Sequence, residues 1–179
     1  MNNVEQVQAL YVGYYGRAAD PDGLAYWSYQ LAHGMSIGAI AASFSVQTES
    51  KVMYPFLNGS SNASQFVDQV YSNLFNRVPD AGGKAYWMNY LTAAQGNPEA
   101  ISVFILAVIG GAQGTDVAIV QNKVDAAEHF TNAVQAAEIE TTVPVNGIPA
   151  LDSDFLSAAR GVVDSEVTAN TGSLQDSFN

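Results

Sequence analysis

The sequence predicts an all-α protein, a multi-helix bundle built from two helix-corner-helix units about sixty residues apart. The first observation is a repeat: residues 10–27 align without a gap on residues 70–87, with Tyr, Arg, Asp, Gly, Ala, Tyr and Trp at equivalent places. The second is periodicity, because apolar residues in each copy recur at spacings of three and four, as on one face of a helix. With 179 residues, 48% of them hydrophobic, the chain is also long enough and apolar enough to bury a core.

The first unit is expected to form a helix, a tight corner and a second helix. Gly16 suits the left-handed residue that ends the first helix. Asp20 suits the N-cap of the second helix, Pro21 its first position and Asp22 its first turn, where the helix dipole favours a negative charge. The apolar face of the first helix consists of Val4, Val7, Leu10, Tyr11, Tyr14 and Tyr15.

The second unit is expected to repeat this arrangement with small changes. Asn76 takes the place of Gly16 as the left-handed stop. Asp80 begins the following helix without a proline behind it. The apolar face consists of Phe66, Val67, Val70, Tyr71, Leu74 and Phe75.

The rest of the chain is expected to be mostly helical, with a linker at 59–62 between the repeats. Residues 140–149 contain two prolines and several β-branched residues, which predicts an extended connector. These patterns divide the chain into a duplicated helical domain (1–138), a connector (139–150) and a short helix with a flexible tail or linker (151–179). Further helices are predicted at about 37–46, 51–57 with a bend near Pro55, 98–109, 116–137 and 155–167, followed by a loose tail from Thr168.

Composition and charge exclude several classes of function. Seventeen acidic against six basic residues give a net charge of −11, so nucleic acid and bare anionic membrane are poor partners. The absence of cysteine excludes disulfides and thiol chemistry and, with scarce lysine, favours an exported protein. The first residues lack the pattern of a cleavable signal, so we expect an export signal to lie elsewhere. The longest apolar run, 101–111, is about half of a membrane span, so no membrane insertion is expected.

The repeated motif resembles a known family. Leu10-Tyr11, Gly16-Arg17, Asp20 and Gly23 to Trp27, echoed by Arg77, Asp80, Gly83 and Ala85 to Trp87, look like the family catalogued as domain of unknown function 4214. Residues 122–131 resemble that family's closing helix, so the resemblance covers about 4–137. The sequence departs from the pattern at Asn76 and at Lys84, where the first copy has Gly16 and Leu24.

The resemblance implies a helical domain common in large extracellular bacterial proteins. Such domains often stand beside calcium-binding RTX-type repeats and in surface-layer proteins exported by type I secretion. The chain is also similar to the amino-terminal regions by which some surface-layer proteins hold the lipopolysaccharide O-antigen. The family supplies no catalytic residues to carry over.

The repeated arginines leave two interpretations open. Arg17 and Arg77 could be ligand-binding forks, since a guanidinium binds a carboxylate or phosphate through two hydrogen bonds. Alternatively, each arginine hydrogen-bonds the carbonyls that end one helix and pairs with Asp20 or Asp80 at the start of the next. The structural interpretation is favoured because the same corner is built twice.

Aromatic residues near the corners are candidates for contact with sugar rings. Tyr14, Tyr15, Tyr29 and Tyr90 are the tentative glycan-binding residues, together with Arg17 and Arg77. The Tyr-Trp pairs at 26–27 and 86–87 are expected in the core.

No cofactor is certain, but calcium is a candidate. Asp20 and Asp22 could supply carboxylates to a calcium ion, as could the loop 152–154, although capping explains these acids more simply. His33 and His129 stand alone, so no metalloprotease pair or catalytic triad is expected.

These patterns together predict a non-enzymatic module of a secreted bacterial cell-surface protein, surface-layer or adhesin-like. Its expected partners are cell-surface polysaccharide, such as lipopolysaccharide O-antigen, and neighbouring subunits through self-association. Two alternatives stay open. The chain could be a glycan-processing accessory domain in which Asp20 and Asp22 act on a glycosidic bond, or a spacer between other domains.

Overall fold

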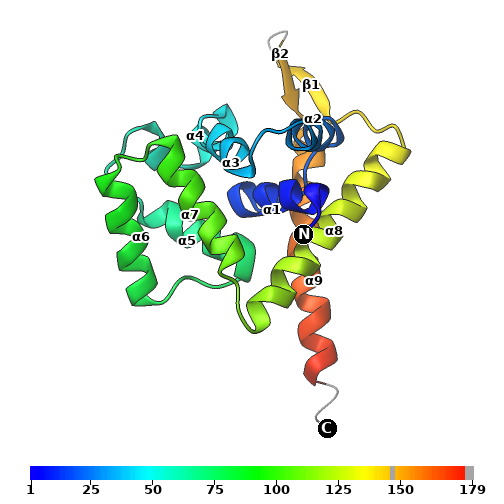
Figure 1. Cartoon of the computed structure of the whole chain (residues 1–179). Coiled ribbons are helices and arrows are strands. Elements are labelled where there is room, and N and C mark those ends of the chain that lie inside the picture. The colour runs from blue at the N-terminus through cyan, green and yellow to red at the C-terminus, as the bar shows by residue number, and fades with distance from the viewer. Residues whose placement is uncertain (146–147, 176–179) are drawn as a thin grey trace.

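The computed structural model describes residues 1–145 and 148–175, and within them the predicted all-α class is confirmed (Figure 1). The repeat as a duplication of whole units stays a prediction. The elements are α1 (Asn3–Tyr15), α2 (Pro21–Ala32), α3 (Ile37–Ser45), α4 (Thr48–Met53), the 3-10 helix η1 (Pro55–Asn58), α5 (Ser64–Phe75), α6 (Ala81–Ala93), α7 (Pro98–Gly110), α8 (Thr115–Ala136), β1 (Thr142–Val145), β2 (Ile148–Leu151) and α9 (Ser153–Gln175).

Two regions of the chain differ from the sequence-based expectation. The expected extended connector forms an antiparallel hairpin in which Thr142 pairs with Leu151 and Val143 with Ala150. The last helix is longer than predicted, since α9 continues to Gln175, whereas a loose tail was expected from Thr168. Periodicity fades there because the segment is rich in Ser, Thr and Asn. The remainder of the expected tail, 176–179, lies outside the described residues.

Helix α1 lies at the centre of the fold. It packs against α2, α5, α7 and α8, which explains why its residues from Val7 to Tyr15 are buried on every side (Figure 1). An aromatic cluster fills the space between α1, α3, α5 and α7. Such rings bury large areas and stabilise the core through edge and tilted contacts. Its members are Tyr14, Phe44, Phe66 and Phe104.

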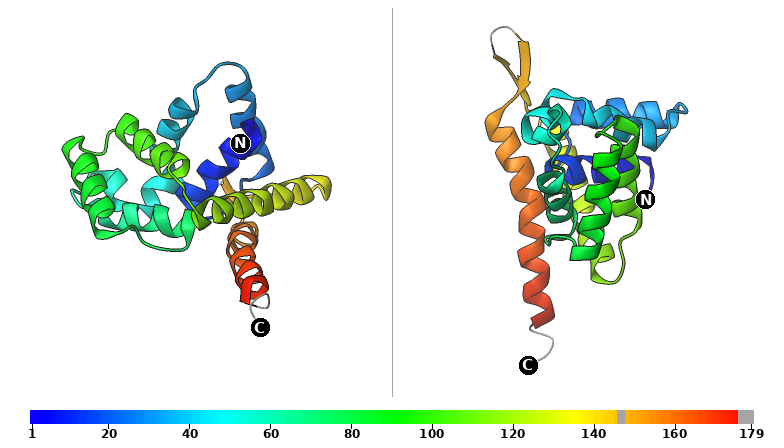
Figure 2. Two further views of the ribbon diagram at one scale, coloured as in Figure 1. Left: turned by 60° about the horizontal axis from the view of Figure 1, so that its bottom comes forward. Right: turned by 90° about the vertical axis from the view of Figure 1, so that its left-hand side faces the viewer.

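Helix α9 is part of the same core. Phe155, Ala159 and Val163 are buried in one hydrophobic cluster with α1. The backbone N–H of Ala18 donates to the carbonyl of Ala159 over 3.0 Å, which attaches the first corner to the middle of α9. Figure 2 shows α9 running along one side of the molecule, with the hairpin at its end. The segment expected as a short helix and linker therefore forms one wall of the folded domain.

The length and hydropathy of the helices were compared with those of a membrane span. Among the described residues, no single helix is long and apolar enough to cross a membrane. Helices α7 and α8 reach that length and composition only as a pair, and they are bent by 108° relative to each other.

Candidate functional site

The two corners are closed by the same local contacts. Gly16 and Asn76 both adopt the left-handed conformation, with φ of 59° and 56°. The carboxylates of Asp20 and Asp80 accept hydrogen bonds from the N–H groups of the glycines three residues later, over 2.7 and 2.8 Å. These are N-cap contacts, so the predicted capping role of both aspartates is confirmed.

Each corner arginine binds a carboxylate from a distant helix. Arg17 binds Glu49 of α4 through two hydrogen bonds of 2.9 and 2.7 Å, and its contact with Asp20 is longer, at 3.9 Å. Arg77 binds Asp116 of α8 through two hydrogen bonds of 3.3 and 2.5 Å. The sequence correctly indicated an arginine that ties the corner together, but it missed Glu49 and Asp116 as the main partners.

The two arginines differ greatly in exposure. Arg17 is 1% exposed and also donates to the carbonyl of Ala18 over 2.8 Å, whereas the Arg77 side chain is 48% exposed. Burial opposes the charge of the Arg17 guanidinium, but Glu49 and Asp20 outweigh it, so the pKa of Arg17 is raised. The interpretation of Arg17 as a free ligand-binding fork is therefore wrong, because its guanidinium is enclosed and already paired.

A substitution in the second corner explains another difference. In the first corner the side-chain oxygen of Gln8 accepts from the N–H of Ala19 over 3.0 Å. The equivalent of Ala19 is Pro79, which has no N–H to donate. The equivalent of Gln8 is Asp68, which instead pairs with Lys84 over 2.5 Å. The Lys84 departure from the family pattern is thus accompanied by a carboxylate that binds it.

The proposed glycan-binding tyrosines fall into two groups. Tyr14 and Tyr15 are buried, and their hydroxyls bind the carbonyl of Ala41 and the hydroxyl of Ser50. Burial raises the pKa of both phenols. Both are therefore core residues, and the prediction that their rings are free to stack on sugars is wrong.

The other two tyrosines lie nearer the surface. Tyr29 is 59% exposed and stacks on His33 at a centroid distance of 3.8 Å. Tyr90 is partly exposed and presents its edge to Trp87. Neither ring belongs to the cavity described below.

The Tyr-Trp pairs do not lie in the core as expected. Tyr26 and Tyr86 are 54% and 61% exposed, and each meets its neighbouring tryptophan in an edge-on contact. Trp27 and Trp87 are partly buried, packing against Phe44 and Phe104 respectively. The prediction placed both residues of each pair in the core, but two neighbouring residues on a helix point in different directions. The tryptophan therefore packs inward while the tyrosine before it faces outward.

A groove of about 930 Å³ opens beside the first corner. Its walls come from α1, α2, α3, α4, β2 and α9, so residues distant in sequence meet there. Trp27 lines the groove together with the paired Arg17 and Glu49, while Arg160 of α9 contributes a second guanidinium. Its lining residues are Tyr11, Tyr15, Arg17, Asp20, Trp27, Phe44, Gln47, Thr48, Glu49, Val52, Met53, Ala150, Leu151, Leu156 and Arg160.

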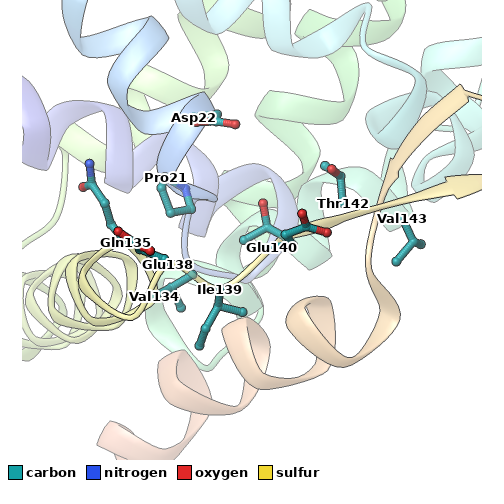
Figure 3. Close-up of a pocket in the computed structure, with 10 residues that line it drawn as sticks. Pro21, Asp22, Val134, Gln135, Glu138, Ile139, Glu140, Thr142 and Val143 are labelled. Carbon is teal, nitrogen blue, oxygen red and sulfur yellow. The ribbon is translucent and has the colours of Figure 1, made fainter.

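A second cavity of about 530 Å³ lies where α8 leads into the hairpin (Figure 3). Its acidic residues are Asp22, Glu138 and Glu140, and no basic residue lines it. In the described part of the chain, no group of three His, Cys, Asp or Glu side chains is placed to hold a metal ion. The calcium site at Asp20 and Asp22 stays a prediction, and the two carboxylates lie in different cavities.

Comparison with known proteins assigns part of the chain to a family. Residues 57–105 match the model of the family described as Domain of unknown function (DUF4214), a segment that contains the second corner from Asn76 to Trp87. No curated protein and no solved structure matches the chain. The chain thus contains, at residues 57–105, a match to the DUF4214 family that the repeated motif resembles.

Proposed function

We propose that the chain is a non-enzymatic carbohydrate-binding module of a secreted bacterial surface protein. In this proposal it holds cell-surface polysaccharide, such as lipopolysaccharide O-antigen, in the groove beside the first corner. The observation that carries the proposal is the combination, in one groove, of Trp27 with the Glu49 carboxylate that the buried Arg17 holds in place.

Each part of the groove suits a different part of a sugar. The partly buried ring of Trp27 offers a flat apolar surface for the C–H face of a pyranose. The carboxylates of Asp20 and Glu49 are acceptors for sugar hydroxyls, while Gln47 and Thr48 add neutral hydrogen-bonding groups. Because Arg17 binds both carboxylates before a ligand arrives, little conformational entropy is lost when they bind hydroxyls.

The same geometry disfavours the enzyme alternative. Asp20 and Asp22 line different cavities, so they do not face one glycosidic bond. Asp20 and Glu49 share a groove, but both contact the Arg17 guanidinium. A glycosidase needs one carboxyl group that donates a proton to the leaving sugar. Two carboxylates held by one cation are suited to accepting hydrogen bonds instead.

Two matched alanine variants test the proposal by retention on cells. Asp20→Ala and Asp80→Ala each remove an N-cap, and each is expected to cost about 1 kcal/mol of stability. Only Asp20 lines the groove, so only Asp20→Ala should reduce retention on intact cells. The wild-type chain should lose retention on cells stripped of surface polysaccharide. Equal retention of all three proteins on intact and stripped cells would exclude glycan anchoring through this groove.

Self-association is a second candidate function, favoured by the exposed second corner. Val78 is 61% exposed beside the half-exposed Arg77, whereas its equivalent Ala18 is covered by α9. A neighbouring subunit could cover this corner as α9 covers the first. Light scattering of the purified chain with and without millimolar calcium tests this, and a monomer under both conditions would argue against it.

A further inference from the structure

We propose that the groove is selective for sugars that carry a carboxylate, and that Arg160 is the residue that binds this group. The inference rests on the proposed carbohydrate-binding function and names its class of ligand. The structure places Arg160, which has no ion-pair partner among the side chains described in 1–143 and 150–165, in the wall of a groove that also contains an aromatic ring.

The pairing of the basic residues distinguishes Arg160. Arg17, Arg77 and Lys84 each form an ion pair, and the amine of Lys123 is buried against the carbonyl of Asn73. Arg160 is exposed and forms no ion pair with the side chains that the structure describes in 1–143 and 150–165. Lys51 also lacks an ion pair within this part of the chain, but it does not line the groove.

The charge of the groove differs from that of the whole chain. The groove is lined by two arginines and two carboxylates, so its formal charge is zero, whereas the chain as a whole carries −11. Both carboxylates contact Arg17, so the Arg160 guanidinium balances the remaining negative charge of the groove without itself forming an ion pair to a side chain described in 1–143 or 150–165. An acidic sugar therefore meets a neutral groove with an accessible guanidinium here, whereas the net negative charge of the rest of the chain repels it.

The backbone of α9 holds Arg160 in position. Its neighbour Ala159 is fully buried, and the Ala159 carbonyl accepts the hydrogen bond from Ala18 in the first corner. The helix is thus fixed next to the site, although the arginine side chain is exposed. A guanidinium can donate two parallel hydrogen bonds to one carboxylate, which neither Gln47 nor Thr48 can do.

A thermodynamic cycle of two proteins and two ligands tests this inference. The probes are oligomers of galacturonate and of mannuronate, each compared with its fully methyl-esterified form, which keeps the rings and removes the charge. Isothermal titration calorimetry with the full chain gives four dissociation constants for each of the two oligomers. For the wild type, the acid form is expected to bind at least about tenfold more tightly than the ester, as for a hydrogen bond to a charged group. For Arg160→Gln this preference should disappear, so that the acid and the ester bind the variant with dissociation constants within about twofold of each other.

Lys51→Gln is the matched control, because it removes one positive charge outside the groove. It should keep the preference for the acid form, and a loss of preference equal to that of Arg160→Gln would overturn the inference in favour of a general charge effect.

If acid and ester bind the wild type equally, the groove binds sugars but Arg160 does not select among them, and only the further inference is wrong. If neither form of either oligomer binds, the inference is wrong, and the retention of Asp20→Ala and Asp80→Ala on cells decides the proposed function separately. Circular dichroism of each variant confirms that the comparison is made between folded proteins.

Discussion

Arg17→Ala is expected to destabilise the protein by about 2–3 kcal/mol, because it removes the buried partner of an ion pair whose other member, Glu49, is partly exposed. The variant leaves the carboxylate of Glu49 and the carbonyl of Ala18 without their donor, and it also removes the contacts of the guanidinium with the rings of Tyr11 and Tyr15. Urea denaturation at pH 7, followed by circular dichroism, measures the free energy of unfolding.

Arg77→Ala is the control that the chain itself provides. Arg77 makes the equivalent contacts with Asp116 and Val78, but its side chain is about half exposed. Exposed ion pairs contribute about 0–1 kcal/mol, so a loss in that range is expected. Equal losses for the two variants would contradict the view that burial, and not the pairing alone, makes the first corner important. Arg17→Lys should fall between, since a lysine keeps the charge but cannot bind Glu49 through two fixed donors.

The second prediction is that the free energy of unfolding increases as the pH is raised above 7. The amine of Lys123 is buried in α8 and donates to the carbonyl of Asn73 in α5 over 2.6 Å. Burial lowers the pKa of Lys123 to about 8, with a small opposing effect from Asp164. Because the unfolded chain holds this proton until a higher pH, it binds more protons than the folded chain above pH 8. Stability therefore increases with pH in that range, by about 2 kcal/mol between pH 7 and 9.5.

Buried tyrosines set the upper limit of this rise. Burial raises the pKa of Tyr11, Tyr14, Tyr15 and Tyr54 above the ordinary value of 10.0. Above that pH the unfolded chain loses phenolic protons that the folded chain keeps, so stability falls again. We expect a maximum in the free energy of unfolding between about pH 9 and 10.

Lys123→Met isolates the contribution of the amine. Methionine keeps much of the apolar stem and has no proton to lose, so the rise between pH 7 and 9.5 should be absent from its stability curve. The decline above pH 10 should remain, since the tyrosines are unchanged. Urea denaturation at half-unit pH steps, on both proteins, gives the difference between the curves. A parallel pair of curves would show that Lys123 is not the group that titrates.

The corners were predictable because their chemistry is local. Gly16, Asp20 and Pro21 act within a few residues of one another, so capping rules place them correctly without knowledge of the fold. The repeat then doubled the evidence, since Asn76 and Asp80 have the same roles sixty residues later.

The groove was not predictable because its residues meet only through tertiary packing. Glu49 follows the predicted helix 37–46, and nothing nearby in the sequence connects it with Arg17. Arg160 lies in the segment interpreted as a terminal helix and linker, and reaches the site only because α9 docks on the first corner. The tyrosines were misassigned for the related reason that α1 is surrounded by other helices, so residues all around it are buried.

The central claim, that sugars bind in the groove of the first corner, is tested most directly by the chain's two tryptophans. Nuclear magnetic resonance of the ¹⁵N-labelled protein resolves one indole N–H signal for each, and the Trp87 signal is an internal control because Trp87 lies outside the groove. On titration with surface polysaccharide fragments, the Trp27 signal should shift in a saturable manner while the Trp87 signal stays in place. Binding that shifts only Trp87, or neither indole, would contradict the claim.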